Sequence, residues 1–142
     1  KALELSLKNM NDYASHIKEI KNYAIEKLAA EIEGVKFNGR SAEEGSLYTV
    51  LSVLLPFKDP MIGLKLDMKG IAISQGSACS SGATKPSMVM MMILDEEEME
   101  SSTPLRISFS HLTTKKDIDA LMNALKEIAS ASKIEKTNIE HR

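Results

Sequence analysis

The chain has one cysteine, Cys79, among its 142 residues, so it cannot form an internal disulfide. A lone thiol fits a reducing compartment, and we expect a cytoplasmic protein. No apolar run approaches the roughly 18 residues of a membrane span, and no secretory signal is visible. Eighteen basic residues against twenty acidic ones give a net charge of −2. Without a basic field we expect no nucleic-acid partner, and without a span no membrane association.

Metal-ligand patterns are missing too. The histidines His16, His111 and His141 are scattered, and no pair has metal-ligand spacing. We therefore expect no metal site. His111 follows the strand expected at residues 105–109 closely enough to lie near the same site.

What is present predicts one globular domain over residues 1–142, with 43% hydrophobic and 27% charged residues. The chain starts with Lys1 rather than methionine, and a helical pattern begins at once without a capping residue. We expect a fragment that lacks the N-terminal portion of its protein. The polar stretch 133–142 should be a frayed tail.

Two long helical patterns enclose a mixture of shorter elements. Apolar residues recur every three or four positions over residues 2–32, which predicts an amphipathic helix. Thr114 should cap a second helix that ends near Ser130. Shorter helices are expected from Asp59-Pro60 and over 87–94, strands over 35–38, 47–55, 71–73 and 105–109, and a solvated acidic face or loop over 95–100.

These elements do not alternate regularly as β-α-β units. The predicted fold class is therefore α+β, with helices on one face of a small, mainly antiparallel sheet. The strand over 47–55 is rich in large apolar and β-branched residues, so we expect it to be buried on both faces.

Cys79 is the first candidate for chemistry. It follows a short apolar run, and its small neighbours build no apolar pocket. Loops usually lie at the surface, so this setting favours an accessible thiol suited to sulfur chemistry. The alternative is a buried structural cysteine. The surrounding loop consists of Gly76, Ser77, Ala78, Ser80, Ser81 and Gly82.

Arg106 is the second candidate. Within a strand, its side chain should point to the face opposite Leu105 and Ile107. A guanidinium binds a carboxylate through two hydrogen bonds, so Arg106 could clamp a substrate carboxylate. The alternative is an arginine on the solvent face.

Methionines crowd residues 88–92, which hold four of the nine in the chain. We expect core packing or an adaptable cover. A docking surface for a partner and a soft-metal site are the alternatives, although no cysteine or histidine is spaced to complete a metal site.

Several segments together resemble the active-site region of NifS-like cysteine desulfurases, which belong to the class V aminotransferase superfamily. LDMKGIAIS at 66–74 leads into GSACSSG at 76–82, and PSMV at 86–89 is similar to the family's Pro-Ser-His/Tyr-Val. LRISF at 105–109 and the following LTT at 112–114 match the family's arginine strand and helix start. The resemblance covers nearly the whole chain.

The resemblance implies the small C-terminal domain of a fold-type I transferase that depends on pyridoxal 5'-phosphate. In that family L-cysteine loses its sulfur to a cysteine on a mobile loop, and L-alanine leaves. By position, Cys79 would be the nucleophile and persulfide carrier, and Arg106 would hold the substrate carboxylate. The long segment between them is similar to the subgroup that delivers sulfur to a scaffold protein for iron–sulfur cluster assembly. A homodimer is implied for the full-length protein.

The family's cofactor lysine lies in a Ser-x-His-Lys motif of a larger N-terminal domain, and this chain has no such motif. We therefore expect the fragment alone to bind no cofactor and to be inactive. Three alternatives stay open: the small domain of a related lyase or aminotransferase, a stand-alone persulfide carrier, and a non-catalytic α+β interaction module.

Overall fold

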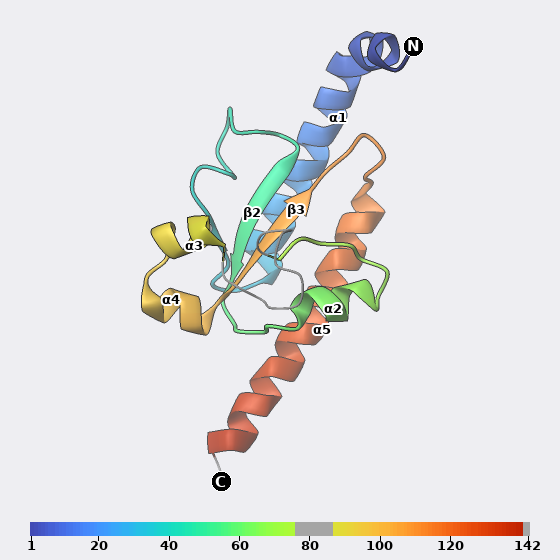
Figure 1. Cartoon of the computed structure of the whole chain (residues 1–142). Coiled ribbons are helices and arrows are strands. Elements are labelled where there is room, and N and C mark those ends of the chain that lie inside the picture. The colour runs from blue at the N-terminus through green and yellow to red at the C-terminus, as the bar shows by residue number, and fades with distance from the viewer. Residues whose placement is uncertain (76–86, 141–142) are drawn as a thin grey trace.

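The computed structural model describes residues 1–75 and 87–140 (Figure 1). Three strands form one antiparallel sheet in the order β1-β2-β3. This architecture confirms the α+β prediction. The elements are α1 (Ala2–Glu31), β1 (Lys36–Phe37), β2 (Val50–Leu55), α2 (Ile62–Asp67), α3 (Met88–Ile93), α4 (Glu96–Ser101), β3 (Thr103–Ser108) and α5 (Lys115–Glu140).

The core lies between the sheet and the two long helices, which run behind the strands in the view of Figure 1. Alternate strand residues face these helices, and Leu51 opposite Ile107 is one such buried pair. The helices bury residues at spacings of three and four, as predicted. From α1 these are Ile17, Ile20, Ala24 and Leu28, and from α5 they are Ile118, Leu121, Met122, Leu125 and Ile128.

Both long helices extend beyond this core. The start of α1 and the end of α5 project in opposite directions in Figure 1. On α1, Leu7 and Met10 remain 60% and 51% exposed, so the predicted apolar face is buried only from Ile17 onward. The α5 helix runs to Glu140, past the end predicted near Ser130. None of the described helices is both long and apolar enough to cross a membrane.

The strand β2 corrects one expectation. Val50 and Ser52 are half-exposed, so burial on both faces holds only for the C-terminal half of the strand. There Leu54 points away from the main core and lines a hollow with Glu98 and Ser102. The α4 helix therefore adds cover on the second face of the sheet.

The helix α2 begins at Ile62, two residues later than predicted, because Asp59 is held in a turn. The Asp59 backbone N–H donates to Thr103 Oγ1 at 2.8 Å. Its carboxylate accepts from the Met61 N–H at 2.9 Å and pairs with Lys65 Nζ at 2.7 Å. These partners bury Asp59 at the base of β3 instead of leaving it as a helix cap.

One other expectation is wrong. Residues 71–73 form no strand; among the described residues the bridge on this side joins Ser74 to Arg106. The acidic stretch, expected as a solvated face or a loop, is the exposed helix α4, so the solvated face is confirmed. The Asp95 carboxylate caps this helix by accepting from the Glu98 N–H at 2.8 Å, and further glutamates in the first turn favour the positive end of the helix dipole.

Candidate functional site

The site is organised by one contact between distant parts of the sequence. The Arg106 N–H donates to the Ser74 carbonyl at 2.9 Å, and the Ser74 N–H returns a bond of 3.4 Å. The Arg106 guanidinium also donates to Ser74 Oγ at 3.1 Å. The chain that enters the cysteine loop is thus attached, through backbone and side chain, to the candidate arginine.

The orientation of Arg106 follows the prediction from strand alternation. Leu105 and Ile107 are 2% and 6% exposed, whereas Arg106 lies on the opposite, exposed face. Its cross-strand partner on β2 is Ser52, whose hydroxyl accepts a hydrogen bond from the Asn38 side-chain amide at 3.1 Å. Arg106 forms no ion pair with any carboxylate whose side chain is described in residues 1–75 and 87–132. Its donors not bonded to Ser74 suit an incoming carboxylate.

A buried hydrogen-bond set fixes the strand that carries Arg106. Thr103, which is 2% exposed, donates from its hydroxyl to the Phe57 carbonyl at 2.7 Å and accepts from the Asp59 N–H. Gln75 then rests against α2, where a Cβ on Gly63 would lie 3.2 Å from the Gln75 side-chain oxygen. The strand that carries Arg106 is therefore held by the β2–α2 connection, and the segment that carries Ser74 is held by α2.

Cys79 and the other predicted loop residues, Gly76, Ser77, Ala78, Ser80, Ser81 and Gly82, lie outside the described residues. Their roles stay predictions.

His16 and His111 lie at the junction between α1 and the β3–α5 connection, and His141 lies outside the described residues. The His111 ring stacks on Tyr13 with a centroid separation of 4.2 Å. His16 Nε2 lies 2.8 Å from the Thr113 carbonyl oxygen and donates to it. These contacts assign both rings to helix packing, and the described contact of His111 is with α1 rather than with Arg106. No group of three or more potential metal ligands occurs among the described residues.

The methionine-rich helix α3 lies within the predicted range 87–94, but its core-packing alternative is wrong. None of its residues is buried. Met88 and Met92 are 79% and 84% exposed, so core packing is excluded for them. Among the alternatives weighed from the sequence, a surface role fits this exposure.

A covalent pyridoxal phosphate site requires a lysine with an available amine, and the one lysine buried in the described part of the chain does not offer one. This lysine is Lys21, at 4% exposed. Burial lowers the pKa of this amine. The ammonium donates to Ser46 Oγ and to the Leu47 carbonyl, both at 2.9 Å, so it anchors the loop before β2.

Comparison with known proteins defines the class. The sequence profile of the aminotransferase class-V family matches residues 1–121, and the chain belongs to this family. The resemblance found from the sequence is thereby confirmed.

The individual relatives are cysteine desulfurases. The mitosomal cysteine desulfurase of Encephalitozoon cuniculi is 32% identical over 123 residues, covering 87% of this chain and 27% of the relative. The cysteine desulfurase IscS of Clostridium botulinum is 32% identical over 130 residues, covering 90% and 32%. The chain thus spans about a third or less of the length of these curated relatives.

Solved structures agree on the fold. The NifS-like protein from Rickettsia africae superposes with a TM-score of 0.68 at 26% identity, covering 89% of this chain and 31% of that one. A second structure, titled NifS-like protein, also gives a TM-score of 0.68, at 21% identity. The sheet and the two long helices are therefore arranged as in the matching third of these NifS-like structures.

Proposed function

We propose that this chain is the small C-terminal domain of a cysteine desulfurase, and that Cys79 receives the sulfur of L-cysteine. The observation that carries the proposal is the paired contact of Ser74 with Arg106. It attaches a carboxylate-binding side chain to the segment that leads, five residues later, to the one thiol of the chain. The identities to named cysteine desulfurases support the same assignment.

Arg106 and Cys79 have separate roles in the proposed reaction. Arg106 holds the α-carboxylate of L-cysteine, which orients the substrate thiol toward the loop. The Cys79 thiolate attacks the substrate sulfur, because the thiolate and not the thiol is the nucleophile. The substrate carbon–sulfur bond breaks, a sulfur–sulfur bond forms on Cys79, and the carbon skeleton leaves as L-alanine after gaining a proton. The sum is balanced, since a thiol and L-cysteine become a persulfide and L-alanine.

In this proposal the cofactor, its lysine and the sulfur acceptor are supplied from outside this chain. Pyridoxal phosphate, on which the family depends, belongs in this proposal to a lysine of a larger domain, so the chain alone is inactive. The complete protein works as a homodimer and passes its sulfur to an acceptor such as a scaffold for iron–sulfur cluster assembly. A reducing cytoplasm suits this chemistry, because a persulfide thiol must stay unoxidised.

The test is alanine formation from L-cysteine by the complete protein and its Cys79→Ser and Cys79→Ala variants. We expect both variants to lose alanine formation while keeping the unfolding transition of the wild type. Alanine formation at the wild-type rate without the thiol would refute Cys79 as the acceptor. A complete protein that forms no alanine from L-cysteine even with Cys79 intact would instead favour a related lyase acting on another amino acid.

A further inference from the structure

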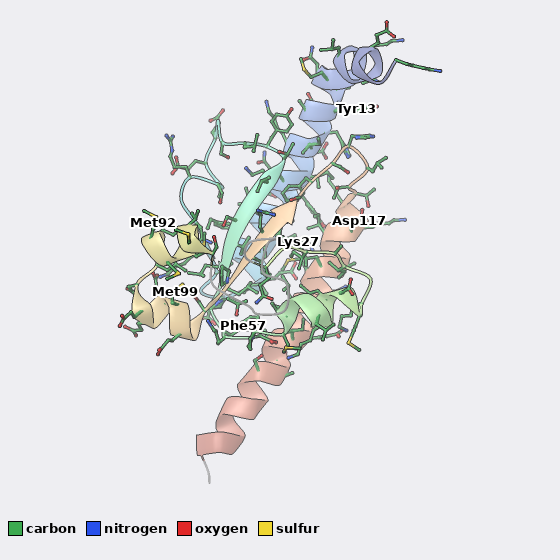
Figure 2. All side chains as sticks on the ribbon, viewed as in Figure 1. Tyr13, Lys27, Phe57, Met92, Met99 and Asp117 are labelled. Carbon is green, nitrogen blue, oxygen red and sulfur yellow. The ribbon has the colours of Figure 1, made fainter. Side chains whose placement is uncertain are left out.

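The helix α3 presents an apolar surface that no other described part of the chain covers. Met88, Met91 and Met92 are 79%, 60% and 84% exposed, and their spacing of three and four places them on one side of the helix. Figure 2 shows α3 and α4 as a separate lobe beside the sheet, away from α1 and α5. An exposed cluster of this kind is a common mark of an interaction site.

The lobe is attached to the sheet through α4. Lys36 Nζ of β1 pairs with the Glu98 carboxylate at 2.6 Å, and Lys58 Nζ donates to the Met99 carbonyl. These contacts connect α4 to β1 and to Lys58, while Met88, Met91 and Met92 of the neighbouring helix α3 remain exposed.

An acidic row borders the methionines. Glu96, Glu97 and Glu100 are exposed on α4, which is separated from the end of α3 by two residues. Among the side chains described in 1–75 and 87–132, none of the three is paired with a cation, whereas Glu98 of the same helix is. The exposed surface thus combines thioether groups with uncompensated negative charge.

We propose that α3 and α4 form a docking surface, here called the acidic methionine surface, for a basic amphipathic helix of a partner protein. The apolar side of such a helix would cover Met88, Met91 and Met92, and its lysines or arginines would pair with the glutamates of α4. Flexible methionine side chains adapt to an apolar helix face, and acidic borders select basic partners. A second copy of the chain fits less well, because a symmetric contact would bring the same acidic rows together. The proposal goes beyond sulfur transfer and does not depend on Cys79.

The direct probe is a synthetic amphipathic helix of leucine and lysine, titrated into the chain with its methionine methyl groups isotopically labelled. We expect the NMR signals of Met88, Met91 and Met92 to shift on binding. Met68 is the matched internal control, since it is 80% exposed but follows α2. A helix of leucine and glutamate should produce no shift. Equal shifts at Met68, or binding of both peptides, would overturn the proposal.

Two sets of variants separate the apolar and charged contributions. Met88→Gln with Met92→Gln keeps good helix formers but removes the thioethers, and Glu96→Gln with Glu97→Gln and Glu100→Gln removes the charge. We expect each set to weaken binding about tenfold or more, against little change for Met68→Gln. Circular dichroism checks that every variant keeps its helices. Unchanged affinity in either set contradicts the proposal.

The last measurement uses the complete protein and a soluble paramagnetic agent. Methyl signals of α3 that broaden as strongly as that of Met68 show that the surface stays open in the complete protein. Signals that are protected without any partner would show that another part of the same protein covers α3, and the proposal of a separate partner would then be wrong. Neither outcome bears on alanine formation, so this test and that of the proposed function fail independently.

Discussion

Arg106 and Ser74 are joined by a pair of backbone hydrogen bonds and by a side-chain bond of 3.1 Å from the guanidinium to the serine hydroxyl. They are 32 positions apart in the sequence. Because the backbone bridge sets their register, the candidate carboxylate clamp and the start of the cysteine loop hold a fixed relation.

Replacing Arg106 should mainly impair substrate binding in the complete protein. Hydrogen bonds to charged groups contribute about 1.5–3 kcal/mol, so Arg106→Ala should lower kcat/KM for L-cysteine by about 10- to 100-fold. Arg106→Lys should recover only part of this loss, since an ammonium cannot form the two-pronged contact. Steady-state kinetics measure both effects, with the KM rising.

The matched control for that experiment is Arg40→Ala. Arg40 is 82% exposed and pairs with Glu43 in the loop before β2. We expect kcat/KM near the wild-type value for this variant. A loss equal to that of Arg106→Ala would mean that the effect reflects general positive charge rather than the geometry at Ser74.

Removing the Thr103 hydroxyl should destabilise the strand that carries Arg106. Thr103→Val preserves the shape of the side chain but leaves the buried Phe57 carbonyl and Asp59 N–H without their partner. Unsatisfied buried groups cost about 1–3 kcal/mol each, so the free energy of unfolding should fall by about 2–4 kcal/mol. Urea unfolding measures the change, and Thr49→Val, at a half-exposed position, is the control. Equal small effects in the two variants would contradict the role given to Thr103.

The start of α5 should make stability depend on pH. The Asp117 carboxylate accepts from the Thr114 N–H and from the Thr114 hydroxyl, both at 2.8 Å. These bonds, the backbone one foremost, lower the pKa of Asp117 below its ordinary 3.8. A native pKa below the unfolded one stabilises the fold above pH 3.8, and this contribution is lost as the pH falls through the native pKa.

The corresponding experiment compares unfolding of the wild type with that of Asp117→Asn across this pH range. We expect the wild type to be the more stable at neutral pH and the difference to shrink in acid. Asp12→Asn, an exposed position on α1, should show no such trend. A difference that is constant down to the lowest pH would exclude the charged form of Asp117 as its cause.

Elements with strong local signals could be predicted from the sequence. The apolar spacing of α5 and its Thr114 cap are complete within one stretch of chain, and the structure places both as predicted. The exposed direction of Arg106 also followed from strand alternation alone. Its attachment to Ser74 could not be predicted, because a single isolated bridge leaves no periodic pattern.

The misplaced features depend on partners that are distant in the sequence. Asp59 resembles a helix cap locally, but Thr103, 44 positions away, holds it in a buried turn. Met88 and Met92 resemble core residues in composition, yet α4 is what packs against the sheet. For Asp59 the tertiary contact decides between local structures of similar intrinsic preference, whereas for α3 the helix forms as predicted and only the burial of its side chains differs.

The central claim is that Cys79 carries sulfur taken from L-cysteine. The most direct measurement is mass spectrometry of the complete protein after brief exposure to L-cysteine labelled in its sulfur. We expect the peptide containing Cys79 to gain the mass of one labelled sulfur atom. A thiol reductant should remove this sulfur, and Arg106→Ala should slow its appearance. If an active enzyme releases alanine while Cys79 remains unlabelled throughout turnover, Cys79 is not the sulfur carrier.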